Sequence, residues 1–214
     1  MKIRIMLATF AAVGLAMAAD TSLTSLPPAK KTGGKPLMEA LAKRQTNRTF
    51  ATKALPKQTL ADLLWAANGV NRPDSGKRTA PSARDRREID VYALTKDGAF
   101  LYMPDEHALK LVNPSDLRVS SGTQEFAHDA PVTLVLVVNR KRQNMGGSGN
   151  WWAERLGAID AGIVSQNISL FAASAKLNSV VLGIFDAKAL HASLKLEKES
   201  EVHLAQPVGF PPKK

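Results

Sequence analysis

The sequence predicts an α+β fold, in which helices and strands are mixed without a strict β-α-β alternation. Three observations predict it. Residues 57–67 space their apolar side chains at helical intervals before a stop at Asn68-Gly69. Two β-favouring runs, 89–94 and 99–103, flank a Lys-Asp-Gly turn and are typical of a hairpin. Residues 132–138 are uninterrupted and apolar, so we expect a central strand buried on both faces.

The longest periodic segment, residues 151–177, is apolar nearly all round, and such a helix must be covered on every side. A second subunit is one possible cover, which gives an extensive homodimer interface; a central position within a monomer is the other. We also expect a short amphipathic segment over residues 37–42 and a basic loop over residues 71–87. Toward the C-terminus we expect a strand over residues 180–184, a short helix over residues 186–194 and an edge strand over residues 201–208.

The N-terminus has the three-part layout of a secretory signal peptide. Lys2 and Arg4 precede an apolar run over residues 5–15, which is too short to span a bilayer, and Ala16-Met17-Ala18 follows. We expect cleavage after Ala18 and a periplasmic or secreted product without stable membrane insertion. An uncleaved anchor is the alternative.

The remaining chain has the length of one domain with a full hydrophobic core. After the signal peptide over 1–18, residues 19–36 are rich in Pro, Gly, Thr and Lys and are predicted to form a flexible arm; residues 37–214 form the domain. Cysteine is absent, which excludes disulfides, thiol catalysis and cysteine-ligated metal. The four histidines show no metal-ligand spacing, so no metal site is expected.

The formal net charge is +10 at pH 7, so a basic binding module for anionic polymers or membrane surfaces is an alternative function. Nucleic acid is not an expected partner of an exported chain without a recognisable binding motif. The basic run 140–142 precedes glycines at 146–149 that lack the lysine and hydroxyl of a nucleotide loop. We interpret this stretch as a flexible connection and expect Arg140 to lie on an exposed loop.

The stretch Arg44-Gln45-Thr46-Asn47-Arg48-Thr49-Phe50 carries two guanidiniums that bracket a hydroxyl at alternate positions. On an extended strand such residues share one face, so Arg44, Thr46 and Arg48 would converge on one point. Arginine binds phosphate bidentately, and a neighbouring hydroxyl adds a further hydrogen bond. The motif predicts a phosphate site, with a solvated basic patch as the alternative.

Several separated motifs occur in one order, and through them the chain resembles the FMN-dependent nitroreductase family, particularly its exported branch and the related dehydrogenases of peptide-heterocycle synthesis. The motifs are Arg44-Gln45-Thr46-Asn47-Arg48-Thr49-Phe50, Leu63-Leu64-Trp65-Ala66-Ala67-Asn68-Gly69, Arg78-Thr79-Ala80-Pro81-Ser82-Ala83, Ala130-Pro131-Val132, Asp160-Ala161-Gly162-Ile163-Val164-Ser165-Gln166-Asn167 and Gly209-Phe210-Pro211. Each is weak alone, but together they span nearly the whole mature chain.

The resemblance implies a mostly antiparallel central sheet packed by helices, in an intertwined homodimer with one FMN per subunit at the interface. It implies that Arg44, Thr46 and Arg48 hold the phosphate and ribityl chain, with Gln45 also among the cofactor-binding residues. The loop Pro81-Ser82-Ala83 would pass along the flavin ring. The backbone at Gly183-Ile184 would direct an N–H at the flavin N5, and Lys213 or Lys214 would return to the phosphate.

Asp85 departs from the family pattern, in which an asparagine stands two residues beyond the Pro-Ser-Ala loop. An aspartate can accept a hydrogen bond from the flavin N3–H, but it cannot donate an amide proton to a ring carbonyl. One of the flanking arginines, Arg84, Arg86 or Arg87, is a candidate for that donor.

In such enzymes the flavin carries the reactivity, which agrees with the lack of a convincing acid/base pair in the sequence. The resemblance implies ping-pong hydride transfer through the flavin N5 to a quinone, nitroaromatic or similar small acceptor. Free NAD(P)H is expected mainly in the cytosol, whereas this protein is expected to be exported. The donor is therefore left open between NAD(P)H and another small molecule. A family member that binds flavin without turnover is the other alternative.

Overall fold

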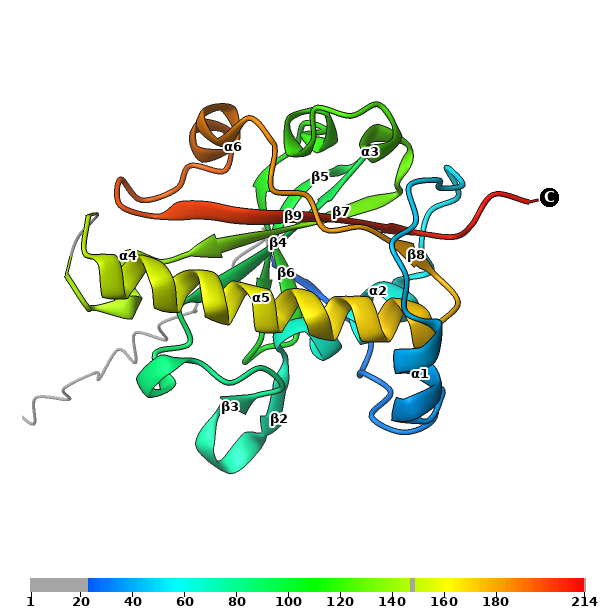
Figure 1. Cartoon of the computed structure of the whole chain (residues 1–214), viewed down its shortest axis with the longest axis horizontal. Coiled ribbons are helices and arrows are strands. Elements are labelled where there is room, and N and C mark those ends of the chain that lie inside the picture. Colours follow the sequence, from blue (N-terminus) through cyan, green and yellow to red (C-terminus); the bar gives the residue numbers. More distant parts are fainter. Residues whose placement is uncertain (1–22, 147–148, 214) are drawn as a thin grey trace, which may run out of the picture.

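The computed structural model describes residues 23–146 and 149–213, so the predicted signal peptide lies outside the described residues and stays a prediction. Its main sheet has seven strands in the order β1-β6-β5-β4-β7-β9-β8, and every neighbouring pair is antiparallel (Figure 1). The predicted α+β class with a mostly antiparallel sheet is therefore confirmed.

In chain order the elements are β1 (Leu23–Ser25), α1 (Leu37–Lys43), α2 (Lys57–Asn68), β2 (Val70–Arg72), the 3-10 helix η1 (Pro73–Ser75), β3 (Lys77–Arg78), η2 (Ala83–Asp85), β4 (Ile89–Thr95), β5 (Gly98–Met103), β6 (Ala108–Asn113), η3 (Arg118–Ser121), α3 (Phe126–Asp129), β7 (Val132–Val138), α4 (Arg140–Gln143), α5 (Trp151–Ser174), β8 (Asn178–Ser179), α6 (Ala187–Ser193) and β9 (Glu201–Gly209).

The strongest local signals are confirmed. Helix α2 ends at Asn68 with Gly69 as its cap, and β4 and β5 form the predicted hairpin. Gly98 in the hairpin turn has a φ of +134°, and a Cβ there would lie 2.7 Å from the carbonyl oxygen of Asn113, so both backbone and space require glycine. All residues of β7 are buried, as predicted for a central strand.

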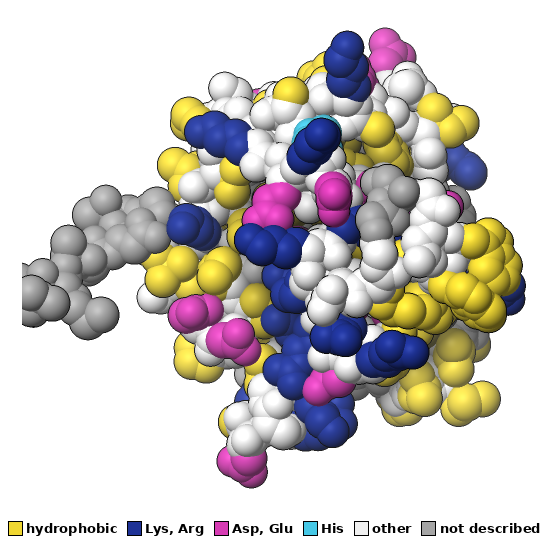
Figure 2. Space-filling view, turned by 90° about the vertical axis from the view of Figure 1, so that its left-hand side faces the viewer, with side chains coloured by type: hydrophobic (Ala, Val, Ile, Leu, Met, Phe, Trp, Pro, Cys, Tyr) yellow, Lys and Arg dark blue, Asp and Glu magenta, His cyan; other side chains and the backbone are white. Residues whose placement is uncertain are grey.

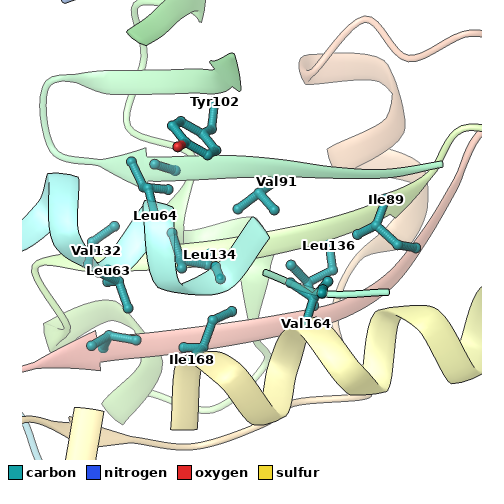
Figure 3. Close-up of a cluster of buried hydrophobic side chains, with 14 of the residues drawn as sticks. Leu63, Leu64, Ile89, Val91, Tyr102, Val132, Leu134, Leu136, Val164 and Ile168 are labelled. Carbon is teal, nitrogen blue, oxygen red and sulfur yellow. The ribbon is translucent and has the colours of Figure 1, made fainter. Parts of the chain in front are cut away.

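Two helical layers cover the sheet. On one face, Leu63 and Leu64 of α2 and Val164 and Ile168 of α5 pack on the apolar side chains of β7 (Figure 3). On the other face, Leu190 of α6 belongs to a second buried cluster, and α3 lies on the same side (Figure 1). Successive side chains of β7 point to opposite faces of the sheet and pack in the two clusters in turn, which explains why this strand is apolar throughout although the sheet is antiparallel.

Helix α5 is apolar nearly all round, but its own chain covers only one side. Asn150 caps its start by accepting hydrogen bonds from the backbone N–H groups of Trp152 and Ala153. One face is buried on α2 and the sheet, whereas Trp151, Trp152 and Ile159 are 56, 59 and 47 % exposed. The helix is long and apolar enough to cross a membrane, but its packed face is that of a core helix of a folded domain.

Several expected elements differ in the structure. In the described part of the predicted flexible arm, β1 pairs with β6 at the sheet edge, and the backbone N–H of Lys30 donates to Asp62. The predicted loop 71–87 contains the small β2–β3 hairpin. Strand β6 was not predicted from the sequence. Local composition misses these short pairings because the hydrogen bonds that form them come from distant residues.

The C-terminal half departs from expectation in two places. The predicted strand 180–184 is wrong: within this range only Leu182 forms a bridge, to Ala205, and the short strand β8 precedes it at Asn178–Ser179 and pairs with β9. Strand β9 is not an edge strand: it lies between β7 and β8. By contrast, the predicted Asp186 cap is confirmed, since its carboxylate accepts from the backbone N–H of Ala189 at 2.8 Å.

Arg140 does not lie on an exposed loop, which corrects the expectation from the basic run. It is 2 % exposed at the start of α4. Its guanidinium donates to the side chain of Gln143, to the carbonyl of Ala153 and to the carboxylate of Glu201. Distant partners therefore hold this arginine in the interior.

Candidate functional site

A small polar cavity of about 40 Å³ lies where the end of α1 meets α5 and β8. We call it the 44–47 cavity. Its walls come from three segments of the chain: Lys43, Arg44, Gln45, Thr46 and Asn47; Ser169, Ala172 and Ala173; and Leu177, Ser179, Val180 and Val181.

The segment that forms one wall is held in place by its backbone. Helix α1 ends where Arg44 turns to an extended conformation, with φ −62° and ψ 121°. The N–H of Asn47 donates to the carbonyl of Ser179 at 3.0 Å, and the N–H of Ala51 donates to that of Phe210 at 2.8 Å. These bonds fix the segment beside the end of the sheet, so its side chains meet those of α5 and β8.

The cavity favours an anion. Its walls carry two cationic side chains, Lys43 and Arg44, and the hydroxyls of Thr46, Ser169 and Ser179, and they carry no carboxylate. Glu39 pairs with Lys43 at 3.0 Å but lies outside the lining. Cations and hydroxyl donors around a space of this size suit a small oxyanion such as phosphate.

The structure brings together part of the predicted phosphate motif. Arg44, Gln45 and Thr46 line the cavity, whereas Arg48 is exposed and lies outside the lining. The segment is not a regular strand, so the predicted convergence of alternate side chains does not extend to Arg48, whose contact with a ligand stays a prediction. Sequence reasoning missed Lys43 and the two serines, because hydroxyls on a helix and a two-residue strand carry no local signal.

The predicted ring loop, residues 81–83, is held against α5. The N–H of Ala83 donates to the carboxylate of Asp160 at 2.8 Å, and the N–H of Arg87 donates to the hydroxyl of Ser82 at 2.7 Å. Arg84, Asp85 and Arg87 have φ values of 56, 53 and 53°, in the left-handed region that side chains disfavour. Strain of this kind persists only where surrounding contacts over-determine the backbone, and it clusters at functional sites.

Asp85, the residue that departs from the family pattern, is already engaged. Its carboxylate accepts from the guanidinium of Arg87 at 2.8 and 3.0 Å. This hydrogen bond lowers the pKa of Asp85, and the nearby positive charges act in the same direction. The side chain is thus an ion-paired acceptor, and Arg87 is directed at it.

One chain does not bring the ring loop to the 44–47 cavity. The loop is attached to α5 at Asp160, whereas the cavity touches α5 at Ser169, Ala172 and Ala173. From Asp160 to Ser169 is nine residues of helix, which is about 14 Å along the axis.

The predicted N5 segment lies close to the cavity along the chain. Ser179, Val180 and Val181 line the cavity, and Gly183 and Ile184 follow directly. Around Gly183, a Cβ would meet no atom within 4 Å, and Ile184 is 73 % exposed. The backbone here is therefore open to a ligand.

The C-terminal tail does not fold back on its own chain. It runs outward from the body in Figure 1, and Lys213 is exposed. Lys214 lies outside the described residues. A contact of either lysine with a phosphate stays a prediction.

Lys and Arg side chains gather in a band on the face shown in Figure 2. Part of this charge is paired: Arg142 contacts Asp90 at 2.6 Å and Arg87 contacts Asp85 at 2.8 Å. No group of three or more potential metal-ligating side chains occurs among residues 23–146 and 149–213. The 44–47 cavity, which combines cations with converging hydroxyls, is therefore the stronger candidate site.

The chain is similar to known proteins over most of its length. The sequence profile described as the nitroreductase family matches residues 41–210. A protein of Methanocaldococcus jannaschii, provisionally named nitroreductase MJ1384, is 28 % identical over 185 residues, which cover 81 % of this chain and 90 % of that protein. A crystal structure from Ralstonia eutropha with the same provisional name has a TM-score of 0.84 and 37 % identity, covering 92 % of this chain and 94 % of that one.

A more distant structure shares the fold alone. The NADPH:FMN oxidoreductase of Vibrio harveyi, solved with NAD+, has a TM-score of 0.62 and 19 % identity, over 83 % of this chain and 69 % of that one. The profile match covers most of the chain, and the Ralstonia structure matches nearly its full length in sequence and fold. On these grounds the chain belongs to the nitroreductase family.

Proposed function

We propose that this protein is an FMN-dependent oxidoreductase that transfers a hydride from a small donor to a small acceptor such as a quinone or nitroaromatic compound. Family membership supports the reaction class. The observation that carries the proposal is the 44–47 cavity, a basic, hydroxyl-lined space next to the open backbone at Gly183.

The residues present fit the cofactor. A volume of about 40 Å³ suits a phosphate group and is too small for the flavin ring. Arg44 and Lys43 would supply charge, Thr46 would donate its hydroxyl, and the backbone at Gly183-Ile184 would lie beside the ring. When bound, FMN accepts a hydride at N5 and passes it on. The protein holds the phosphate, orients the ring and leaves one ring face open to substrates.

The exposed apolar side of α5 favours a homodimer. The ring loop 81–83 is about 14 Å along α5 from the cavity. A second copy packed on the exposed face of α5 would place its own ring loop near the cavity of the first. The exposed apolar side chains Trp151, Trp152 and Ile159 lie on α5 and would be covered.

The proposal is tested on the purified protein by its visible spectrum, followed by anaerobic addition of NADH, NADPH and dithionite in turn. Flavin absorbance that a nicotinamide donor bleaches, and an acceptor restores, is the expected result. Absorbance bleached by dithionite alone would favour another donor or a flavin binder without turnover. A colourless protein that does not bind added FMN would contradict the proposal. It would favour the alternative function, a basic binding module for anionic polymers or surfaces.

Arg44→Ala is expected to weaken FMN binding by about 1.5–3 kcal/mol, roughly ten- to a hundredfold, because a charge-assisted hydrogen bond to phosphate is lost. Riboflavin binding should change little, since riboflavin lacks the phosphate. Calorimetric titration of the apo-protein measures both ligands, with the exposed Lys96→Ala on the β4–β5 turn as a matched loss of charge. Equal affinity of Arg44→Ala and the original protein for FMN would refute the phosphate assignment.

Ile159→Asp is expected to convert the dimer to monomers, because a charge would be buried unpaired in an interface above roughly 2,000 Å². Light scattering measures the mass, and the exposed Val119→Asp in η3 is the control. Ile168 is unsuitable for this test, since it is fully buried in the core of its own chain, and Ile163 packs on that core. A monomeric, flavin-loaded original protein would contradict the dimer.

A further inference from the structure

A buried polar network lies directly beneath the 44–47 cavity. Gln206 of β9 is fully buried, and its amide contacts three serines. Ser165 Oγ lies 2.8 Å from Gln206 Oε1, while Ser169 Oγ and Ser179 Oγ each lie 3.0 Å from Gln206 Nε2. Ser169 and Ser179 line the cavity, whereas Ser165 does not. The network therefore connects the core of the domain to the cavity wall.

The direction of each hydrogen bond follows from the chemistry of the groups. Ser169 Oγ lies 3.0 Å from the backbone carbonyl of Ser165, and a carbonyl only accepts, so the Ser169 hydroxyl hydrogen is used there. Ser169 must then accept from Gln206, which places the amide NH₂ on the side of Ser169 and Ser179. The amide oxygen faces Ser165, which donates to it. The orientation of the amide is thus set by the network itself.

One hydroxyl hydrogen remains without an acceptor. Ser179 Oγ accepts the second N–H of Gln206, so its own hydrogen must point elsewhere. Among the residues that the structure describes, none accepts a hydrogen bond from the Ser179 hydroxyl. Ser179 is 6 % exposed, and the exposed part borders the cavity. The Ser179 oxygen keeps a second lone pair as well as this hydrogen, but a fully ionised oxyanion has no hydrogen to donate, so toward such a ligand the hydroxyl acts as a donor.

We infer that Ser179 donates a hydrogen bond to the phosphate oxygens of a ligand in the 44–47 cavity, and that Gln206 is the positioning residue that fixes this direction. The inference rests on the proposed function, in which the cavity takes the FMN phosphate. It adds a specificity-determining donor: because Gln206 donates to Ser179, the Ser179 hydrogen stays available for an ionised oxyanion, which accepts hydrogen bonds and has no hydrogen of its own to donate. Arg44 and Lys43 supply the charge that such a group requires.

The test titrates the apo-protein with FMN and with riboflavin, following the quenching of flavin fluorescence. Ser179→Ala should raise the dissociation constant for FMN about tenfold and leave that for riboflavin unchanged, because the lost donor serves only the phosphate. Ser115→Ala is the control: it removes the hydroxyl of an exposed serine outside this network and away from the cavity wall, and both constants should stay within about twofold.

Gln206→Met tests the positioning role. It releases the Ser179 hydroxyl from its fixed direction, so the preference for FMN over riboflavin should fall, but by less than in Ser179→Ala. Thermal unfolding of each apo-variant is recorded first, so that a folding defect is not read as a binding defect. If Ser179→Ala keeps the full preference for FMN, or loses both flavins equally, the inference is wrong. If the original protein shows no preference for FMN, the phosphate assignment of the cavity fails before the variants are compared.

Discussion

Arg140→Ala should lower the free energy of unfolding by about 3 kcal/mol, because it removes the buried half of an ion pair and the hydrogen bonds that accompany it. The side chain of Arg140 is 1 % exposed and that of Glu201 is 35 % exposed. Burial is the largest single influence and raises the pKa of Glu201, but the hydrogen bonds and charges of Arg140 and His203 together outweigh it and lower the pKa. The loss also leaves the buried oxygen of Gln143 without this donor.

The measurement is urea unfolding followed by circular dichroism at one protein concentration. Lys141→Ala is the control within the same basic run, since the Lys141 side chain is 82 % exposed and reaches Glu197 only at 4.0 Å. It should change the free energy of unfolding by less than about 0.5 kcal/mol. Equal stability of the two variants would show that Arg140 is not held in the interior.

Glu88→Gln should stabilise the protein by up to about 3 kcal/mol above pH 7 and have little effect near pH 4.5. Glu88 is fully buried at the start of β4, and both oxygens of its carboxyl lack a hydrogen-bond partner among the described residues. Burial raises its pKa from 4.5 to about 7; the neighbouring carboxyl of Asp160 acts in the same direction, and Gln143 opposes it.

The sign follows from proton binding. Between pH 4.5 and about 7 the folded state keeps a proton on Glu88 that the unfolded state releases, so stability falls as pH rises through this window. A neutral amide removes that dependence. Thermal unfolding of Glu88→Gln and of the original protein between pH 4.5 and pH 8 measures this pH dependence, with the exposed Glu125→Gln as control. If the difference between Glu88→Gln and the original protein is the same at pH 4.5 and pH 8, Glu88 does not titrate as described.

The same carboxyl pair bears on the site, because Asp160 also accepts from the N–H of Ala83 in the ring loop. Ionisation of Glu88 places a negative charge beside the carboxyl that holds this loop. The strained residues Arg84, Asp85 and Arg87 follow directly. The position of this strained loop therefore depends in part on the charge of the carboxyl pair to which it is attached.

About half of the candidate site could be predicted from the sequence. Arg44, Gln45 and Thr46 were found because they lie in one short motif, and they line one wall of the cavity. Lys43, Ser169 and Ser179 were missed, because their role depends on α1, α5 and β8 meeting in space. Arg48 was expected in the same wall, but the segment after α1 is not a regular strand.

The sequence by itself determined the elements whose signals are local: the α2 helix with its Gly69 stop, the β4–β5 hairpin, the buried β7 strand and the Asp186 cap. Periodicity, turn chemistry and capping act over a few residues, so a single stretch of chain suffices to show them. Only the tertiary structure decided the burial of Arg140, through Glu201 at a separation of 61 residues, and the direction of the Ser179 hydroxyl, through Gln206 at a separation of 27. A charge or hydroxyl prefers water unless it is paired in the interior, so the partners that the fold brings to it decide whether it faces water, the core or a ligand.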